Sequence, residues 1–228
     1  MLPDRHLDLG CGKRPRNPYG RGRLSGVDIR PLESSDDFEY RTANLTLEAI
    51  PYESDRFGSV SAFDFIEHVP RVLASGDDRG TVFPFIRLMD EIWRVLAPGG
   101  LFYAVTPAYP HAEAFQDPTH VNIITDRTHD YFCGDKPLAR MYGFGGRFEV
   151  RRLEWVAVHQ AYSAHHPTPR SNAAKQLAHA LRDAVRRLRG RPVRFDRTYV
   201  LWELEAIKTP AGAAGPGSSE ADAGDELQ

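Results

Sequence analysis

Side chains that can hold and transfer a proton are concentrated in residues 109–132, which contain three histidines and four carboxylic acids. Within this segment the sequence Asp-Pro-Thr-His places Asp117 three residues before His120. A histidine titrates near neutral pH and can accept a proton from a hydroxyl group, and a nearby carboxylate can orient its ring. We therefore predict that His120 is a general base and that Asp117 orients it or binds the reacting molecule. His68, next to Glu67, is a second candidate.

The same tetrapeptide allows two other interpretations. It could form a turn in which Asp117 caps the backbone and Pro118 fixes the bend, so that His120 only packs against its neighbours. A metal ion held by Asp117, His120 and another acid is also conceivable, but no two histidines are four residues apart, as they are in helical metal sites. We therefore assign no metal ligand from the sequence.

Glycines and an acid mark the end of a short apolar stretch near the N-terminus, "HLDLGCG". This stretch predicts a buried strand that ends in Asp8, Gly10, Cys11 and Gly12. Because glycine has no side chain, the backbone there can approach a ligand closely. The end of this strand is therefore the first predicted part of a binding site.

Three further strand ends carry residues suited to a nucleoside. Asp28, followed by Ile29, ends the second predicted strand, and its carboxylate can accept hydrogen bonds from both hydroxyls of a ribose. Asn44 and Leu45 end the third strand and suit the edge and the face of an adenine. Phe63 ends the fourth. Each feature alone is common in proteins, but their occurrence in this order predicts one shared site.

These residues need a sheet that brings the strand ends together. The hydrophobic patterns predict strands at 5–10, 23–29, 39–44, 57–66, 101–107, 147–158 and 197–208. The clearest helix covers residues 80–97, where apolar residues recur at steps of three and four, and another is expected within 128–145. Strands alternating with helices, followed by two late strands without a standard crossover helix, predict a mostly parallel sheet ending in an antiparallel strand. Ligands bind such sheets at the carboxyl ends of the strands.

Composition predicts one domain with a separate tail. The 228 residues are 41% hydrophobic and 26% charged, which is ordinary for a globular protein. Residues 1–208 form the predicted domain, with a basic helical insertion at 160–196. Residues 209–228 carry four acids and no lysine or arginine, and are predicted to be disordered. Two cysteines, no signal peptide and no apolar run long enough to span a bilayer predict a cytoplasmic protein.

Four stretches resemble the successive motifs of class I S-adenosylmethionine-dependent methyltransferases: "LDLGCG", "GVDI", "ANLTLEAIPYESDRFGSVSAFDFIEHV" and "IWRVLAPGGLFYAVTP". The resemblance covers residues 6–108 and, in outline, the chain to residue 208. It implies a Rossmann-like α/β fold, with a seven-stranded mostly parallel sheet, an antiparallel last strand and helices on both faces. It also implies S-adenosylmethionine as the cofactor, bound by Asp8, Gly10, Cys11, Gly12, Asp28, Ile29, Asn44, Leu45 and Phe63.

The stretch after Gly12 departs from the family pattern. It reads "KRPRNPYG", and its two prolines, Pro15 and Pro18, disfavour a helix. Pro15 also stands where a dinucleotide-binding fold needs a third glycine ahead of a helix, which argues against that fold. Lys13 or Arg14 could bind the carboxylate of the cofactor or remain solvated.

We predict methyl transfer from S-adenosylmethionine to an oxygen of a small-molecule or sugar-containing acceptor. Methylation of a small amine, or cofactor binding without catalysis as a partner protein, are the alternatives. The insertion at 160–196 could act as a lid, because the helices that precede the first strand in the family have no counterpart here. Its basic side chains could bind a phosphate-bearing acceptor, contact an anionic membrane surface, or simply be solvated. Nucleic acid is not expected, since the isoelectric point is near 6.5 and no aromatic residues interrupt the basic run.

Overall fold

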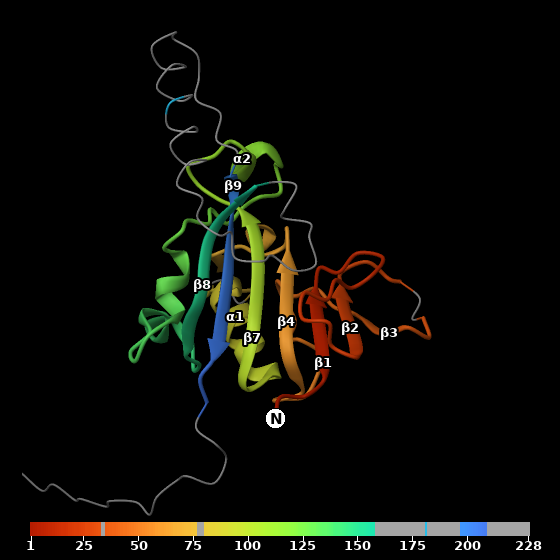
Figure 1. Ribbon diagram of the computed structural model, residues 1–228. Coiled ribbons are helices and arrows are strands. Elements are labelled where there is room, and N and C mark those ends of the chain that lie inside the picture. Colours follow the sequence, from red (N-terminus) through yellow and green to blue (C-terminus); the bar gives the residue numbers. More distant parts are fainter. Residues whose placement is uncertain (33–34, 77–79, 158–180, 182–196, 209–228) are drawn as a thin grey trace, which may run out of the picture.

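A seven-stranded sheet organises the molecule (Figure 1). The computed structural model describes residues 1–32, 35–76, 80–157, 181 and 197–208. The strands of the sheet are β1 (Arg5–Leu9), β2 (Arg23–Asp28), β3 (Phe38–Thr42), β4 (Phe57–Phe63), β7 (Leu96–Pro107), β8 (Phe148–Ala157) and β9 (Arg197–Ala206). Their order in space is β3-β2-β1-β4-β7-β9-β8. The predicted basic insertion at 160–196, apart from the exposed Leu181, and the predicted tail at 209–228 lie outside the described residues.

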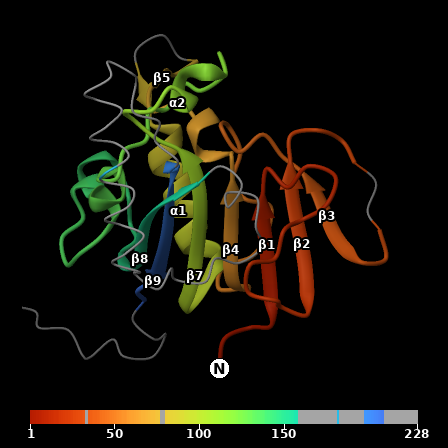
Figure 2. The same cartoon turned by 45° about the horizontal axis from the view of Figure 1, so that its top comes forward.

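The directions of the strands confirm the predicted sheet. Strands β1, β2, β3, β4 and β7 are parallel to one another. The last strand, β9, lies between β7 and β8 and is antiparallel to both. The carboxyl ends of the five parallel strands therefore meet at one edge, which is the upper edge in Figure 1 and comes forward in Figure 2.

The helix α1 (Pro84–Val95) packs against one face of this sheet. It begins four residues later than predicted, because Pro84 fits only the first turn of a helix and Thr81–Val82 instead forms β6, which pairs with β5 (Leu73–Ala74). Its buried stripe contains Phe85, Leu88, Met89, Ile92 and Val95. Among the described residues, α1 is the one α-helix longer than a single turn.

Successive side chains along each strand point to opposite faces of the sheet. The buried apolar residues therefore form two hydrophobic clusters, one on each face. In β9 the side chains of Val200, Trp202 and Leu204 join the cluster beneath α1. The opposite face holds a smaller cluster of Phe63, Tyr103, Val105, Val156, Tyr199 and Leu201, against which Tyr19 packs. Tyr19 belongs to the segment between β1 and β2, so this connection covers part of the second face (Figure 1).

The predicted helix within 128–145 is two short 3-10 helices, η2 (Thr128–Phe132) and η3 (Leu138–Tyr142). Gly134, at a φ of 82°, and Pro137 separate them, and neither residue favours a continuous helix. A single turn of α-helix, α2 (Glu113–Gln116), and the 3-10 helix η1 (Ile66–His68) lie at the carboxyl edge of the sheet.

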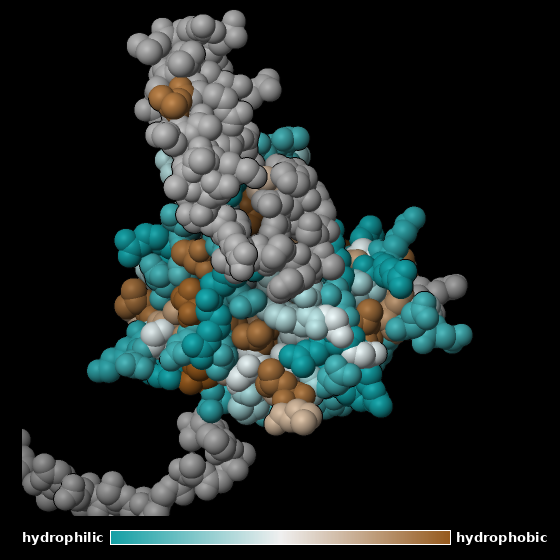
Figure 3. All heavy atoms as spheres, viewed as in Figure 1, coloured by the Kyte–Doolittle hydropathy of each residue, from teal (hydrophilic) through white to brown (hydrophobic). Residues whose placement is uncertain are grey.

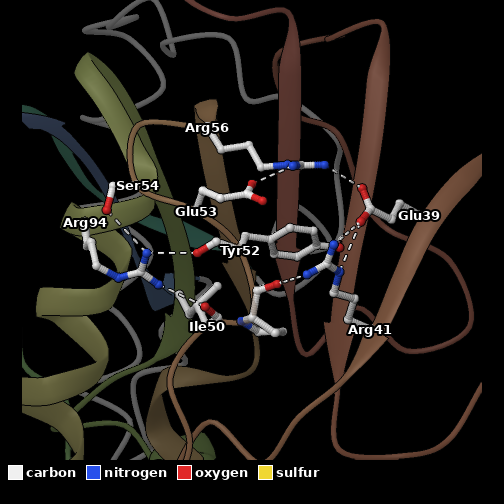
Figure 4. A network of polar contacts seen from close by, with 9 residues as sticks. Glu39, Arg41, Ile50, Tyr52, Glu53, Ser54, Arg56 and Arg94 are labelled. Carbon is white, nitrogen blue, oxygen red and sulfur yellow. Dashed lines mark hydrogen bonds and ion pairs between the residues drawn. The ribbon is translucent and has the colours of Figure 1, made fainter.

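A polar network fixes the segment between β3 and β4 (Figure 4). The guanidinium of Arg41 lies 4.3 Å from the ring centre of Tyr52 and also binds Glu39. Arg56 forms ion pairs with Glu39 and Glu53. This network holds the segment that directly follows Asn44 and Leu45, and so helps to position the end of β3.

The surface seen in Figure 3 carries apolar residues in separate patches between hydrophilic ones. Such scattering is common on protein surfaces exposed to water. In the part of the chain that is described, no helix combines the length and the apolar character required to cross a bilayer.

Candidate active site

The backbone just after β1 has a left-handed conformation at two positions, and both are glycines. Gly10 and Gly12 have φ values of 65° and 60°, which side chains disfavour. A Cβ atom on Gly10 would also lie 2.6 Å from Cδ2 of Phe65. The amide of Gly12 donates a hydrogen bond of 2.9 Å to Oδ2 of Asp28, which ties the ends of β1 and β2 together.

Asp28 presents a charged carboxylate at the end of β2. Its side chain is only 6% exposed, and its two oxygens accept hydrogen bonds from Gly12 and from the backbone and guanidinium of Arg30. Burial alone would raise the pKa of Asp28, but the hydrogen bonds from Arg30 and Gly12 hold that pKa below its usual value. The Arg30 side chain is 61% exposed, so an incoming ligand can displace it at little cost.

Asp8 ends a buried chain of hydrogen bonds across β1 and β4. Ser61 donates to Oδ1 of Asp8 at 2.6 Å, so the Ser61 oxygen is left to accept from Nε2 of His6 at 2.8 Å. Nδ1 of His6 then accepts from Ser59, also at 2.8 Å. Burial raises the pKa of Asp8 to about 7 and lowers that of His6 to about 3, so His6 is neutral.

The side chain of Asp8 binds the backbone of the segment that follows Gly12. The amide of Arg16 donates to Oδ2 of Asp8 at 2.8 Å, and the guanidinium of Arg16 lies 4.6 Å from the ring centre of Phe63. Residues 13–20 contain turns and no helix, as the prolines predict. Lys13 and Arg14 are exposed there, whereas Arg16, which sequence reasoning did not select, lies over a predicted site residue.

The remaining predicted cofactor residues also lie along this edge. Leu45 is buried, and its carbonyl accepts a hydrogen bond of 3.2 Å from Arg87 of α1, while the side-chain oxygen of Asn44 accepts from the amide of Thr46. Cys11 is buried against Gly26, and Ile29 is exposed. The structure thus brings the ends of β1, β2 and β3 together.

Glu67, His68 and His120 form a compact group, called here the Glu67 cluster, at the ends of β4 and β7. One potential ligand atom from each residue lies within 4.8 Å of the other two. Glu67 is 1% exposed, and its Oε2 accepts a hydrogen bond of 2.8 Å from Thr106 in β7. In the part of the chain that the structure describes, its Oε1 has no hydrogen-bond partner, and it lies 4.0 Å from Nε2 of His120. Burial raises the pKa of Glu67 to about 8.

The carboxylate of Asp117 is connected to His68 through Thr119, whereas its backbone carbonyl accepts a hydrogen bond of 3.0 Å from the amide of His120. Oδ1 of Asp117 accepts hydrogen bonds from the amide and the hydroxyl of Thr119, and the Thr119 oxygen contacts Nδ1 of His68 at 2.9 Å. Nδ1 of His120 instead faces the carbonyl of Ala114 at 3.3 Å. The segment has the turn geometry considered as an alternative for Asp-Pro-Thr-His, yet it still carries His120 to Glu67.

The link between the Glu67 cluster and the glycines of β1 is Phe65. Its ring packs on Gly10, and it precedes η1, which contains Glu67 and His68. The rings of His68 and His120 lie edge to face, with centres 4.8 Å apart. Two imidazoles and a buried carboxylate therefore lie beside the predicted cofactor residues, an arrangement able to accept a proton or to bind a cation.

Comparisons with known proteins identify the fold. No protein-family model and no curated protein matches the sequence. Among solved structures, a Haloferax volcanii protein described as a methyltransferase, in complex with the Trm112 methyltransferase activator, is similar with a TM-score of 0.52 and 17% identity, over 91% of this chain and 84% of that one. The YcgJ protein from Bacillus subtilis matches with a TM-score of 0.50 and 16% identity, over 92% and 94%. Together with the strand order, these similarities show that the chain has the Rossmann-like fold of class I methyltransferases.

Proposed function

We propose that this protein transfers a methyl group from S-adenosylmethionine to a hydroxyl oxygen of a small-molecule acceptor. The observation that carries the proposal is the position of Asp28 and the Glu67 cluster along one edge of a class I methyltransferase sheet. The first provides acceptors for a ribose, and the second provides bases for a hydroxyl.

The cofactor side of the proposal is supported by the ends of β1 and β2. The carboxylate of Asp28 can accept hydrogen bonds from two ribose hydroxyls once the exposed Arg30 side chain moves aside. Gly10 and Gly12 leave the backbone open to close approach. Arg16, above Phe63, provides a cation for a carboxylate. When bound, the cofactor supplies a methyl group on a sulfonium, which needs no phosphate site.

The acceptor side is supported by the protonation of the histidines. The Ala114 carbonyl can only accept a hydrogen bond, so Nδ1 of His120 carries the proton and Nε2 is free to receive one. Asp117 acts through Thr119 on His68, which stands beside His120. A hydroxyl acceptor needs such a base, whereas a neutral amine does not. The cluster therefore favours oxygen over nitrogen as the methylated atom.

Binding and turnover test the two parts separately. We expect S-adenosylhomocysteine to bind the full chain in calorimetry, and Asp28→Asn to weaken this binding about tenfold or more, because neutralising the carboxylate weakens its hydrogen bonds to the ribose. Asp37→Asn, which changes an exposed acid directly before β3, is the control. If the ligand does not bind, or if Asp28→Asn binds it like the wild type, the cofactor site is wrong.

A panel of acceptors with radiolabelled S-adenosylmethionine tests the reaction itself. We expect label in alcohols, phenols or sugars. Label found only in amines would favour N-methylation, and binding without label in any acceptor would favour a non-catalytic partner protein.

A further inference from the structure

The Glu67 cluster has the composition of a metal site. We propose that Glu67, His68 and His120 bind a divalent transition-metal ion, with Oε1 of Glu67 and one nitrogen of each imidazole as ligands. One potential ligand atom from each of the three residues lies within 4.8 Å of the others. Two imidazoles and one carboxylate suit ions such as zinc, iron(II) or cobalt(II), and three protein ligands leave positions open for water or substrate.

The carboxylate of Glu67 supplies the independent reason for a cation. The side chain is 1% exposed, and Oε2 is satisfied by Thr106. Oε1 is equally buried but accepts no hydrogen bond from any of the described residues. A buried carboxyl group with one unpaired oxygen is costly in either protonation state, and a bound cation would offset that cost and favour the ionised form.

The histidines cannot provide the missing hydrogen bond while they are neutral. Thr119 has one hydroxyl proton and donates it to Asp117, so Nδ1 of His68 must donate to Thr119. Nδ1 of His120 likewise donates to the carbonyl of Ala114. In both rings this leaves Nε2 without a proton, which is the form that coordinates metals.

Neighbouring groups hold these ligands in place, as they do in known metal sites. The pair Asp117–Thr119 orients His68, and Thr106 fixes the second oxygen of Glu67. Bonds of about 2.1 Å to one ion would place the ligand atoms about 3.4 Å apart. Nε2 of His120 and Oε1 of Glu67 are 4.0 Å apart and the other two pairs lie within 4.8 Å, so the side chains must rotate toward one another to close the site.

An ion at this position would also define the acceptor. Its open positions could hold two neighbouring oxygens of a catechol, a diol or a hydroxy acid and lower the pKa of one of them, and the ion would then replace His120, whose Nε2 it occupies, as the group that activates the hydroxyl. This consequence rests on the proposed function, whereas binding of the ion does not.

Cobalt(II) binding to untagged, metal-free full-length protein tests the proposal, followed by visible absorption and calorimetry. We expect one site in the wild type that Glu67→Gln, His68→Gln and His120→Gln each weaken by about 100-fold, and that Thr119→Val weakens by about tenfold. His111→Gln is the matched control, because His111 packs on Trp155 outside the Glu67 cluster. A His165→Gln and His166→Gln double variant checks the adjacent histidines of the sequence that lie outside the described residues.

Thermal unfolding shows whether a variant has failed to fold. Cobalt(II) should raise the melting temperature of the wild type and of His111→Gln, but not that of the three ligand variants. Binding weaker than roughly 1 mM in the wild type, or equal binding by His120→Gln and the wild type, would overturn the proposal. If the wild type binds cobalt(II) but does not bind S-adenosylhomocysteine, only the proposed function is overturned.

Discussion

The guanidinium of Arg30 covers the carboxylate of Asp28, with Nε 3.0 Å from Oδ1 and Nη2 3.0 Å from Oδ2. These are the oxygens that a ribose would use, so a ligand must compete with the arginine. Arg30→Ala should therefore bind S-adenosylhomocysteine up to about fivefold more tightly, which is the range expected for losing an exposed ion pair. Calorimetry measures this, with Arg23→Ala at the other end of β2 as the control. Weaker binding by Arg30→Ala would mean that Arg30 itself holds the ligand.

Gly10→Ala should destabilise the protein more than Gly20→Ala does. Both glycines have φ values above 60°, so both substitutions strain the backbone, by about 1–2 kcal/mol. Only at Gly10 does the new Cβ meet another group, the ring of Phe65 at 2.6 Å; at Gly20 no atom of the described residues lies within 4 Å of it. The difference between the free energies of unfolding of the two variants, measured in urea, gives the cost of the contact with Phe65. In a Phe65→Ala background Gly10→Ala should cost less stability than it does in the wild type, and an equal cost in the two backgrounds would contradict this explanation.

His6 should make the fold sensitive to acid. Its pKa falls from 6.5 to about 3 on folding because of burial, so between these values the unfolded chain binds a proton that the folded chain does not. Stability is then lost as the pH falls through this window, by up to about 1.4 kcal/mol per pH unit. In His6→Gln this loss should be absent. Chemical unfolding of the variant and the wild type at pH 7, 6 and 5 gives the difference, and parallel curves would contradict the assignment.

Asp8 should make the stability of the fold depend on pH in the opposite direction. Its pKa rises from 3.8 to about 7 on folding, chiefly through burial, so the folded chain holds a proton between these values that the unfolded chain releases. The contribution of Asp8 to stability therefore decreases as the pH rises from 4 to 7. Asp8→Asn should remove that decrease and leave the acid sensitivity due to His6 more pronounced. A variant that keeps the wild-type dependence on pH would show that Asp8 is ionised throughout.

His120→Ala should reduce turnover about 100-fold or more while cofactor affinity is retained, because the ring accepts the acceptor proton. The measurement is single-turnover methyl transfer with an acceptor found in the panel, together with calorimetry. His111→Ala, which changes another histidine of the same segment, should keep near-normal turnover. A similar rate for His120→Ala and the wild type would remove His120 from this role.

The sheet could be predicted from the sequence because its signals are local. Alternation and apolar runs mark the seven strands, and the glycines after Leu9 mark where the first one ends. The start of α1 and the break within 128–145 were missed because proline and glycine overrode the apolar pattern.

The contacts within the site depend on residues far apart in the chain. Nothing near His6 in the sequence indicates that Ser59 and Ser61 would form hydrogen bonds with it. Nothing near Asp117 indicates that Thr119 would form a hydrogen bond with His68. Glu67 was noted only as a neighbour of His68. Its burial beneath Thr106 could not be read from the sequence, since it requires β4 and β7 to pair.

The position of β9 has a consequence for synthesis on the ribosome. Among the described strands, the edge strand β8 has one neighbour in the sheet, β9, and β9 is the last to be made. Until Arg197–Ala206 has emerged, the nascent chain must hold β8 apart from β7, and the space for Trp202 stays unfilled. Ribosomes that stall before this point would therefore release a protein with two additional open strand edges, one on β7 and one on β8, a form prone to aggregate and suited to recognition by chaperones.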